Sequence, residues 1–110
     1  MKILCLCDHG NNRSVHFAHQ LKYWDHDVIA AGLDKNSAVT LSMLYAWADV
    51  IIITAEFQRE KLPKYYRDDP KVKLFSVGPD IYPRPFNPIL LELVKKILKE
   101  NESWLKPKTK

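Results

Sequence analysis

The sequence predicts an α/β fold built on a parallel sheet, and three observations support this. Four short apolar segments, at 2–7, 27–32, 50–54 and 73–77, alternate with segments of helical periodicity, as in consecutive β-α-β units. The third segment, VIIIT, has no polar residue before its last position, which indicates a strand covered on both faces. The chain has 110 residues, enough for one packed core but not for two.

Three helices are expected between these strands. Residues 14–24 and 38–48 each repeat apolar side chains at the three- and four-residue spacing of a helix that packs on a sheet. A third, weaker helix is expected from about 55 to 62, because Pro63 disfavours its continuation. The alternation of strands and helices is then complete up to residue 77.

A fourth helix is predicted near the C-terminus. Asn87 is a suitable N-cap, and Pro88 suits the first helical position. The buried stripe of this helix is expected to contain Leu90, Val94, Ile97 and Leu98. After about residue 100 the chain becomes polar and rich in lysine. We therefore expect a single domain over 1–100 and a polar tail over 101–110.

Composition excludes several classes of partner. The formal net charge is +4, but the lysines crowd the C-terminal end, so we expect no nucleic acid as a partner. No apolar run approaches the roughly 20 residues of a membrane span, and the opening KILCLC is shorter than a signal sequence needs. Cys5 and Cys7 lie two residues apart and do not form a disulfide framework. A cytoplasmic protein with reduced thiols and no membrane contact is expected.

The segment DHGNN, residues 8–12, has the composition of a loop that wraps around an anion. Gly10, Asn11 and Asn12 are residue types that adopt left-handed backbone conformations at least cost. Such a loop can turn several N–H groups toward one point, and the following helix adds its own N–H groups and the positive end of its dipole. Ligands of parallel sheets bind beyond the carboxyl ends of strands, so this loop is expected to hold a phosphate or sulfate ion.

Cys7 and Arg13 flank this loop. Arg13 offers a planar guanidinium that matches two oxygens of a phosphoryl group. Cys7 ends the first strand, where the loop amides and the guanidinium favour its thiolate form, a strong nucleophile. Ser14 can donate a hydrogen bond to that thiolate, or serve only as a hydroxyl in the first helical turn. The sequence thus predicts a phosphate-binding loop with a nucleophile at one end.

With these features the chain resembles the low-molecular-weight protein tyrosine phosphatases. The matching stretches are CDHGNNRS after the first strand, AGL after the second, WADVIIIT leading into the third and PDIY after the fourth. Together they span residues 2 to about 100, and the loop is the most specific of them. The resemblance implies a three-layer α/β/α fold with a four-stranded parallel sheet in the order 2-1-3-4.

The resemblance also implies a hydrolase that works through a phosphocysteine intermediate on a phosphorylated protein (phosphotyrosine) or a small phosphomonoester. Cys7 would be the nucleophile, Arg13 would bind the phosphoryl oxygens and Asp80 would be the general acid. The substrate pocket would be lined by Asp8, His9, Gly10, Asn11, Asn12, Ser14 and Tyr82. No metal ion or cofactor is needed, because the arginine and the backbone amides supply the positive charge.

Asp80 is a candidate on other grounds as well. It follows the fourth predicted strand in a loop rich in Pro and Gly, and so belongs to the same edge of the sheet as Cys7. Its task would be to protonate the leaving oxygen and then to activate water. The alternative is a turn aspartate within GPD.

Two features depart from the family pattern. Gly10 and Asn11 come one position later than the equivalent glycine and asparagine of the family, while the spacing from Cys7 to Arg13 is unchanged. Asp8 places a carboxylate beside the nucleophile, where it opposes thiolate formation and repels phosphate unless its side chain points out of the loop. The chain is also shorter than is usual for the family.

Two other functions stay open. A phosphocarrier, similar to the B subunits of sugar-transport phosphotransferase systems, has a cysteine after its first strand but must hold phosphocysteine without hydrolysing it, and Arg13 and Asp80 are unfavourable to that role. A binding module that keeps the anion loop but lacks turnover is the other, with Asp8 as the reason. Arsenate reduction on this fold needs further cysteines, and none follows Cys7.

A metal centre is disfavoured. Cys5, Cys7, His9, His16 and His19 lie near one another in the sequence, but a strand that passes directly into a tight loop cannot easily converge its side chains on one ion. Cys5 is expected to be a buried strand residue. The two helical histidines, His16 and His19, are expected on a solvated or partly buried face.

Overall fold

Four parallel strands form the centre of the computed structural model, which describes residues 1–8, 13–77 and 87–106. The order of the strands in the sheet is β2-β1-β3-β4, and every neighbouring pair is parallel. The predicted fold class and strand order are therefore confirmed. The strands are β1 (Lys2–Cys7), β2 (Asp27–Gly32), β3 (Val50–Ile53) and β4 (Val72–Leu74).

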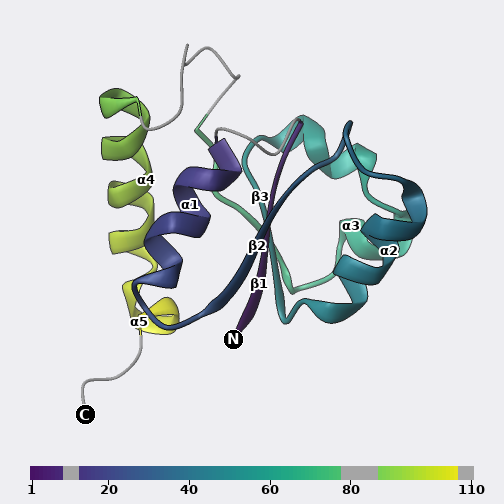
Figure 1. The fold of residues 1–110 in the computed structure, drawn as a ribbon, viewed down its shortest axis with the longest axis horizontal. Coiled ribbons are helices and arrows are strands. Elements are labelled where there is room, and N and C mark those ends of the chain that lie inside the picture. Colours follow the sequence, from purple (N-terminus) through teal and green to yellow (C-terminus); the bar gives the residue numbers. More distant parts are fainter. Residues whose placement is uncertain (9–12, 78–86, 107–110) are drawn as a thin grey trace.

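Helices cover both faces of this sheet (Figure 1), as a buried parallel sheet requires. On one face lie α1 (Arg13–Lys22), α4 (Pro88–Glu100) and α5 (Glu102–Leu105). On the other lie α2 (Ala38–Trp47) and α3 (Lys64–Arg67), the latter preceded by the 3-10 helix η1 (Glu56–Lys61). In chain order, each strand is thus followed by a described helical segment: α1 follows β1, α2 follows β2, η1 follows β3 and α4 follows β4.

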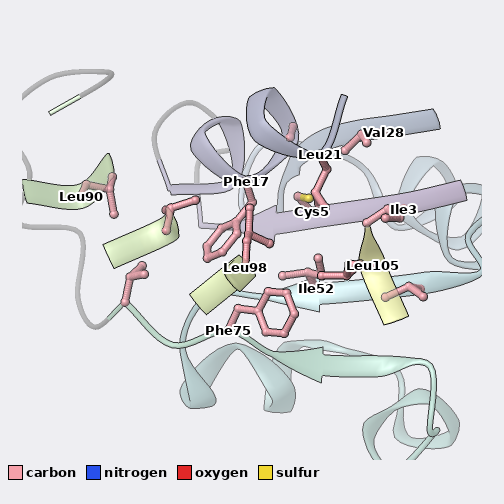
Figure 2. Close-up of a cluster of buried hydrophobic side chains, with 14 residues drawn as sticks. Ile3, Cys5, Phe17, Leu21, Val28, Ile52, Phe75, Leu90, Leu98 and Leu105 are labelled. Carbon is pink, nitrogen blue, oxygen red and sulfur yellow. The ribbon is translucent and has the colours of Figure 1, made fainter. Parts of the chain in front are cut away.

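Alternate residues of β1 supply the two halves of the core. Ile3 and Cys5 belong to the cluster beneath α1, α4 and α5, which Figure 2 shows together with Phe17 of α1 and Leu98 of α4. Leu4 and Leu6 point to the opposite cluster. The second cluster also contains Ile51, Ile53, Leu41, Tyr45 and Leu62. Burying an aliphatic side chain contributes about 1.5 to 3 kcal/mol, so these residues fix the layers.

The register of the strands brings their carboxyl ends to one edge. Cys7 lies opposite Gly32 in the pairing of β1 with β2, and Leu6 lies opposite Ile53 in the pairing of β1 with β3. Ile53 in turn lies opposite Leu74 of β4. The segments that follow all four strands therefore leave the sheet at the same edge, where ligands of this fold class bind.

Two elements differ from the sequence prediction. The segment predicted as a weak α-helix over 55–62 is the 3-10 helix η1, which ends before Pro63. The fourth strand occupies Val72–Leu74 instead of 73–77. The reason is that β3 ends at Ile53, so the residues after Leu74 have no strand residue of β3 to pair with. Val77 still donates a backbone hydrogen bond of 3.1 Å to the carbonyl of Thr54.

The start of α4 agrees with its prediction. The side-chain oxygen of Asn87 accepts hydrogen bonds from the backbone N–H groups of Ile89 and Leu90, and Pro88 occupies the first turn. Such a cap contributes about 1 kcal/mol. The predicted stripe faces the core, with Leu90, Val94 and Leu98 buried and Ile97 partly buried.

Packed structure continues into the stretch predicted as a polar tail. Residues Glu102–Leu105 form α5, and Leu105 is 1% exposed within the first core cluster. The carbonyl of Leu105 is hydrogen-bonded to Nε2 of His26, whose Nδ1 lies 3.1 Å from the N-terminal ammonium of Met1. Leu105 supplies the buried surface of this turn, and the ring of Trp104, although exposed, lies against Phe75. Within the described ranges, no helix combines the length and apolar character needed to cross a bilayer.

Candidate functional site

Cys7 lies at the carboxyl end of β1 and is fully buried. Its backbone carbonyl accepts a hydrogen bond of 2.9 Å from Leu33, so the end of the strand is held against the segment after β2. Its sulfur lies 3.1 Å from the hydroxyl oxygen of Ser14. A hydroxyl at this distance can exchange a hydrogen bond with the sulfur of Cys7.

Arg13 and Ser14 form the first turn of α1, and both are fully buried. Nη2 of Arg13 lies 3.3 Å from Oδ2 of Asp8, which begins the loop. A buried guanidinium needs a counter-charge, because removing it from water is costly. The side chain of Arg13 is therefore directed to the loop side of α1, where sequence analysis expected an anion site, and not to bulk solvent.

Asp8 makes contacts that the sequence did not predict. Its Oδ1 lies 3.0 Å from Nζ of Lys61, while Oδ2 faces Arg13, so one carboxylate lies between two cations. Its backbone carbonyl also accepts a hydrogen bond of 2.8 Å from the N–H of Asp34. The two cations offset the negative charge that a carboxylate brings next to Cys7.

Lys61 and Asp34 are site residues that sequence reasoning missed. Lys61 ends η1 and lies 3.1 Å from Oδ1 of Asp34, which follows β2. The hydrogen bond with Asp8 raises the pKa of Lys61; partial burial opposes this rise, and Asp34 adds to it. The strand order could have pointed to these two residues. Because β2 and β3 flank β1, the segments that follow β2 and β3 leave the sheet at the same edge as the segment that follows β1.

A buried polar network supports the end of β1 from the β3 side. The hydroxyl of Thr54 donates to the carbonyl of Leu6 at 3.1 Å and accepts from Nε2 of Gln58 at 3.0 Å. Oε1 of Gln58 in turn accepts from the backbone N–H groups of Thr54 and Ala55. Both side chains are fully buried, so each satisfied bond avoids a desolvation cost of about 1 to 3 kcal/mol. The network fixes the residue next to Cys7.

Cys5 is a buried residue of the core. It lies in the first core cluster, as predicted (Figure 2), and both cysteines are free thiols. Burial raises the pKa of Cys5 far above the ordinary thiol value, and the nearby Cys7 adds to the rise. Cys5 therefore stays protonated and inert, which leaves Cys7 as the other thiol of the chain.

Several predicted site residues lie outside the described residues. These are His9, Gly10, Asn11, Asn12, Asp80 and Tyr82. Of the two histidines expected on a solvated or partly buried face, His19 is exposed, but His16 is 1% exposed. The prediction for His16 was wrong because α1 contacts the strands beneath it and α4 beside it, which leaves little of its surface open. In the part of the chain that the structure describes, no group of three or more His, Cys, Asp or Glu side chains could hold a metal ion.

The described residues thus bring together a thiol at the end of β1 and a hydroxyl and a guanidinium at the start of α1. Cys7 and Ser14 are in contact, and Arg13 and Asp8 form an ion pair beside them. Such an arrangement can stabilise a thiolate and bind an anion. Comparison of the chain with protein-family models, with curated proteins and with solved structures finds no match.

Proposed function

We propose that this protein is a cysteine-dependent phosphomonoesterase of the protein tyrosine phosphatase type. The observation that carries the proposal is the contact of 3.1 Å between the sulfur of Cys7 and the hydroxyl of Ser14, at the start of the helix that Arg13 opens. The confirmed strand order agrees with the fold that the resemblance to low-molecular-weight phosphatases implied. The substrate would be a phosphorylated protein or a small phosphomonoester.

The first half-reaction transfers the phosphoryl group to Cys7. The thiolate attacks phosphorus, an S–P bond forms, and the bond from phosphorus to the leaving oxygen breaks. Asp80, in its protonated form, gives its proton to that oxygen, so the leaving group departs as an alcohol or phenol. Arg13 and the loop amides hold the phosphoryl oxygens and offset their charge in the transition state.

The second half-reaction restores the enzyme. Water attacks the phosphorus of phosphocysteine, its proton passes to the Asp80 carboxylate, and the S–P bond breaks to release orthophosphate. Ser14 donates to the sulfur as negative charge returns to it, which makes the thiolate a better leaving group. The nucleophile must remain reduced throughout, and a cytoplasmic location is part of the proposal for that reason.

A second candidate is a phosphate-binding module without effective turnover. The specific observation in its favour is the ion pair between Asp8 and Arg13, because a carboxylate on the guanidinium competes with a phosphoryl group for the same donors. In this case the loop would bind phosphate or a phosphorylated protein, and phosphocysteine would not form.

Hydrolysis of an aryl phosphate tests the proposal. The purified protein is assayed with 4-nitrophenyl phosphate, with vanadate as inhibitor and with trapping of phosphocysteine by rapid acid quench and mass spectrometry. We expect turnover that Cys7→Ser abolishes. Asp80→Asn should slow release of poor leaving groups more than of good ones, because only the former need a proton.

Cys5→Ala is the matched control, since it removes the other thiol of the same strand. We expect it to retain turnover, with some loss of stability from the core. Full activity in Cys7→Ser would exclude the mechanism. Binding of vanadate without hydrolysis would select the binding module, and a long-lived phosphorylated Cys7 without release of orthophosphate would select a phosphocarrier.

A further inference from the structure

The carboxylate of Asp8 has two possible cationic partners, on opposite sides. Oδ2 lies 3.3 Å from Nη2 of Arg13 and Oδ1 lies 3.0 Å from Nζ of Lys61. The guanidinium is fully buried, whereas the side chain of Lys61 is 37% exposed. Asp8 therefore joins the buried cation that the proposed reaction needs to a cation at the surface that it does not need.

Lys61 is held in place by a second carboxylate. Its Nζ lies 3.1 and 3.3 Å from the two oxygens of Asp34, and the backbone N–H of Asp34 donates to the carbonyl of Asp8. Three elements thus meet at the lysine: the end of β1, the segment after β2 and the end of η1. We call Asp8, Asp34 and Lys61 the rim cluster. Its geometry keeps the ammonium within reach of Asp8.

A phosphoryl group bound in the loop would compete with Asp8 for the guanidinium of Arg13. Carboxylate and phosphoryl oxygens use the same guanidinium donors, so a bound dianion and Asp8 compete for Arg13. An unpaired carboxylate left next to a dianion would weaken binding, because the two negative charges repel each other. If Lys61 keeps the carboxylate, Asp8 can release Arg13 while its own charge remains neutralised.

We propose that Lys61 is a positioning residue for the phosphate loop, which holds the Asp8 carboxylate away from Arg13 when a phosphoryl group binds. The inference rests on the proposed phosphate site. Lys61 acts through Asp8 and does not touch the phosphoryl group. Asp8 is therefore a competitor for the arginine in the empty loop and a partner of Lys61 in the occupied one.

The effect is measured as the affinity for orthophosphate and vanadate, by calorimetry, and as KM and kcat with an aryl phosphate. Lys61→Met should weaken anion binding and raise KM by about two- to fivefold, the range of a partly exposed charge pair, with kcat little changed. Lys61→Arg should restore binding, because it keeps the charge. Asp8→Asn should bind the anions more tightly than the natural chain.

The double variant tests whether Lys61 acts by positioning the Asp8 carboxylate or by attracting the anion directly. In the Asp8→Asn background, Lys61→Met should have no more effect than Lys64→Met, which removes an exposed lysine three residues further on. If Lys61→Met is equally harmful with and without Asp8, the lysine attracts the anion directly and the inference is overturned. The same holds if Lys61→Met and Lys64→Met are alike in the natural background.

The outcomes distinguish this inference from the proposed function. A KM and an affinity for orthophosphate and vanadate that do not respond to Lys61→Met overturn the inference alone. Anion binding with the expected dependence on Asp8 and Lys61 but no turnover supports the inference and rejects the phosphatase. A natural chain that binds neither orthophosphate nor vanadate overturns both. Circular dichroism and thermal unfolding verify that each variant is folded before its affinity and kinetics are compared with those of the natural chain.

Discussion

The sulfur of Cys7 lies 3.1 Å from the hydroxyl oxygen of Ser14, across the junction between β1 and α1. Both residues are fully buried, so water does not compete for this contact. The sheet holds one partner and the first turn of the helix holds the other. In the proposed reaction, the hydroxyl would already be positioned to donate to the sulfur, and little reorganisation would be needed.

Removal of this hydroxyl should slow the reaction without unfolding the protein. A hydrogen bond to a charged group contributes about 1.5 to 3 kcal/mol, so Ser14→Ala should lower kcat with an aryl phosphate by roughly ten- to a hundredfold. Ser14→Thr, which keeps a hydroxyl, should lose less. Steady-state kinetics with both variants measures the difference.

Ser37→Ala is a suitable control for Ser14→Ala. Ser37 is an exposed N-cap whose hydroxyl oxygen accepts from the N–H of Thr40 at the start of α2. Its loss should cost about 1 kcal/mol of stability and leave kcat unchanged. A kcat for Ser14→Ala equal to that of Ser37→Ala would mean that the contact with Cys7 plays no part in catalysis.

The fold could be predicted from the sequence because its signals are local. The unbroken apolar run at 50–54 indicated a strand buried on both faces, and Asn87 and Pro88 marked the start of α4. The limits of η1 and β4 were less predictable, since they depend on Gln58 folding back onto Thr54 and on where the neighbouring strand ends. The ends of these two elements are therefore set by tertiary contacts and not by the local sequence.

The site was predictable in part for the same reason. Cys7, Arg13 and Ser14 lie within eight positions of the chain, so their proximity follows from one strand, one loop and one helix. Lys61 approaches Asp8 from 53 positions away, through a contact between two side chains near the surface. Periodicity gives the face of a side chain but not its ion-pair partner. The edge of the sheet that Lys61 and Asp34 share was predictable, but their contacts with Asp8 were not.

Gln58 should matter for stability more than an average polar residue. Gln58→Leu keeps a similar volume but leaves the N–H groups of Thr54 and Ala55 without their shared acceptor, at a cost of about 2 to 4 kcal/mol. Urea unfolding measures this loss. Glu60→Leu, at an exposed position of the same helix, should change stability by less than about 0.5 kcal/mol. Equal effects of the two substitutions would contradict a structural role for the Gln58 network.

Tyr45 gives a prediction at alkaline pH. Its side chain is 2% exposed, and its hydroxyl has no hydrogen-bond partner in the part of the chain that the structure describes. Burial raises the pKa of Tyr45 from 10.0 to about 12, and the neighbouring Tyr66 adds to the rise. Below pH 10 the phenol is neutral in both the folded and the unfolded chain, so its contribution to stability is constant there.

Between pH 10 and about pH 12 the unfolded chain loses the Tyr45 proton while the folded chain keeps it, so stability falls across this window. The loss reaches about 2 to 3 kcal/mol. Tyr45→Phe should remove this component and also raise the free energy of unfolding at pH 7 by about 1 kcal/mol, because a buried hydroxyl without a partner is costly. Urea unfolding at pH 7, 9 and 11 measures both effects. Tyr23→Phe, at a ring that is 76% exposed, is the control for the removal of a phenol. If the profile of Tyr45→Phe runs parallel to that of Tyr23→Phe, ionisation of Tyr45 is not coupled to unfolding.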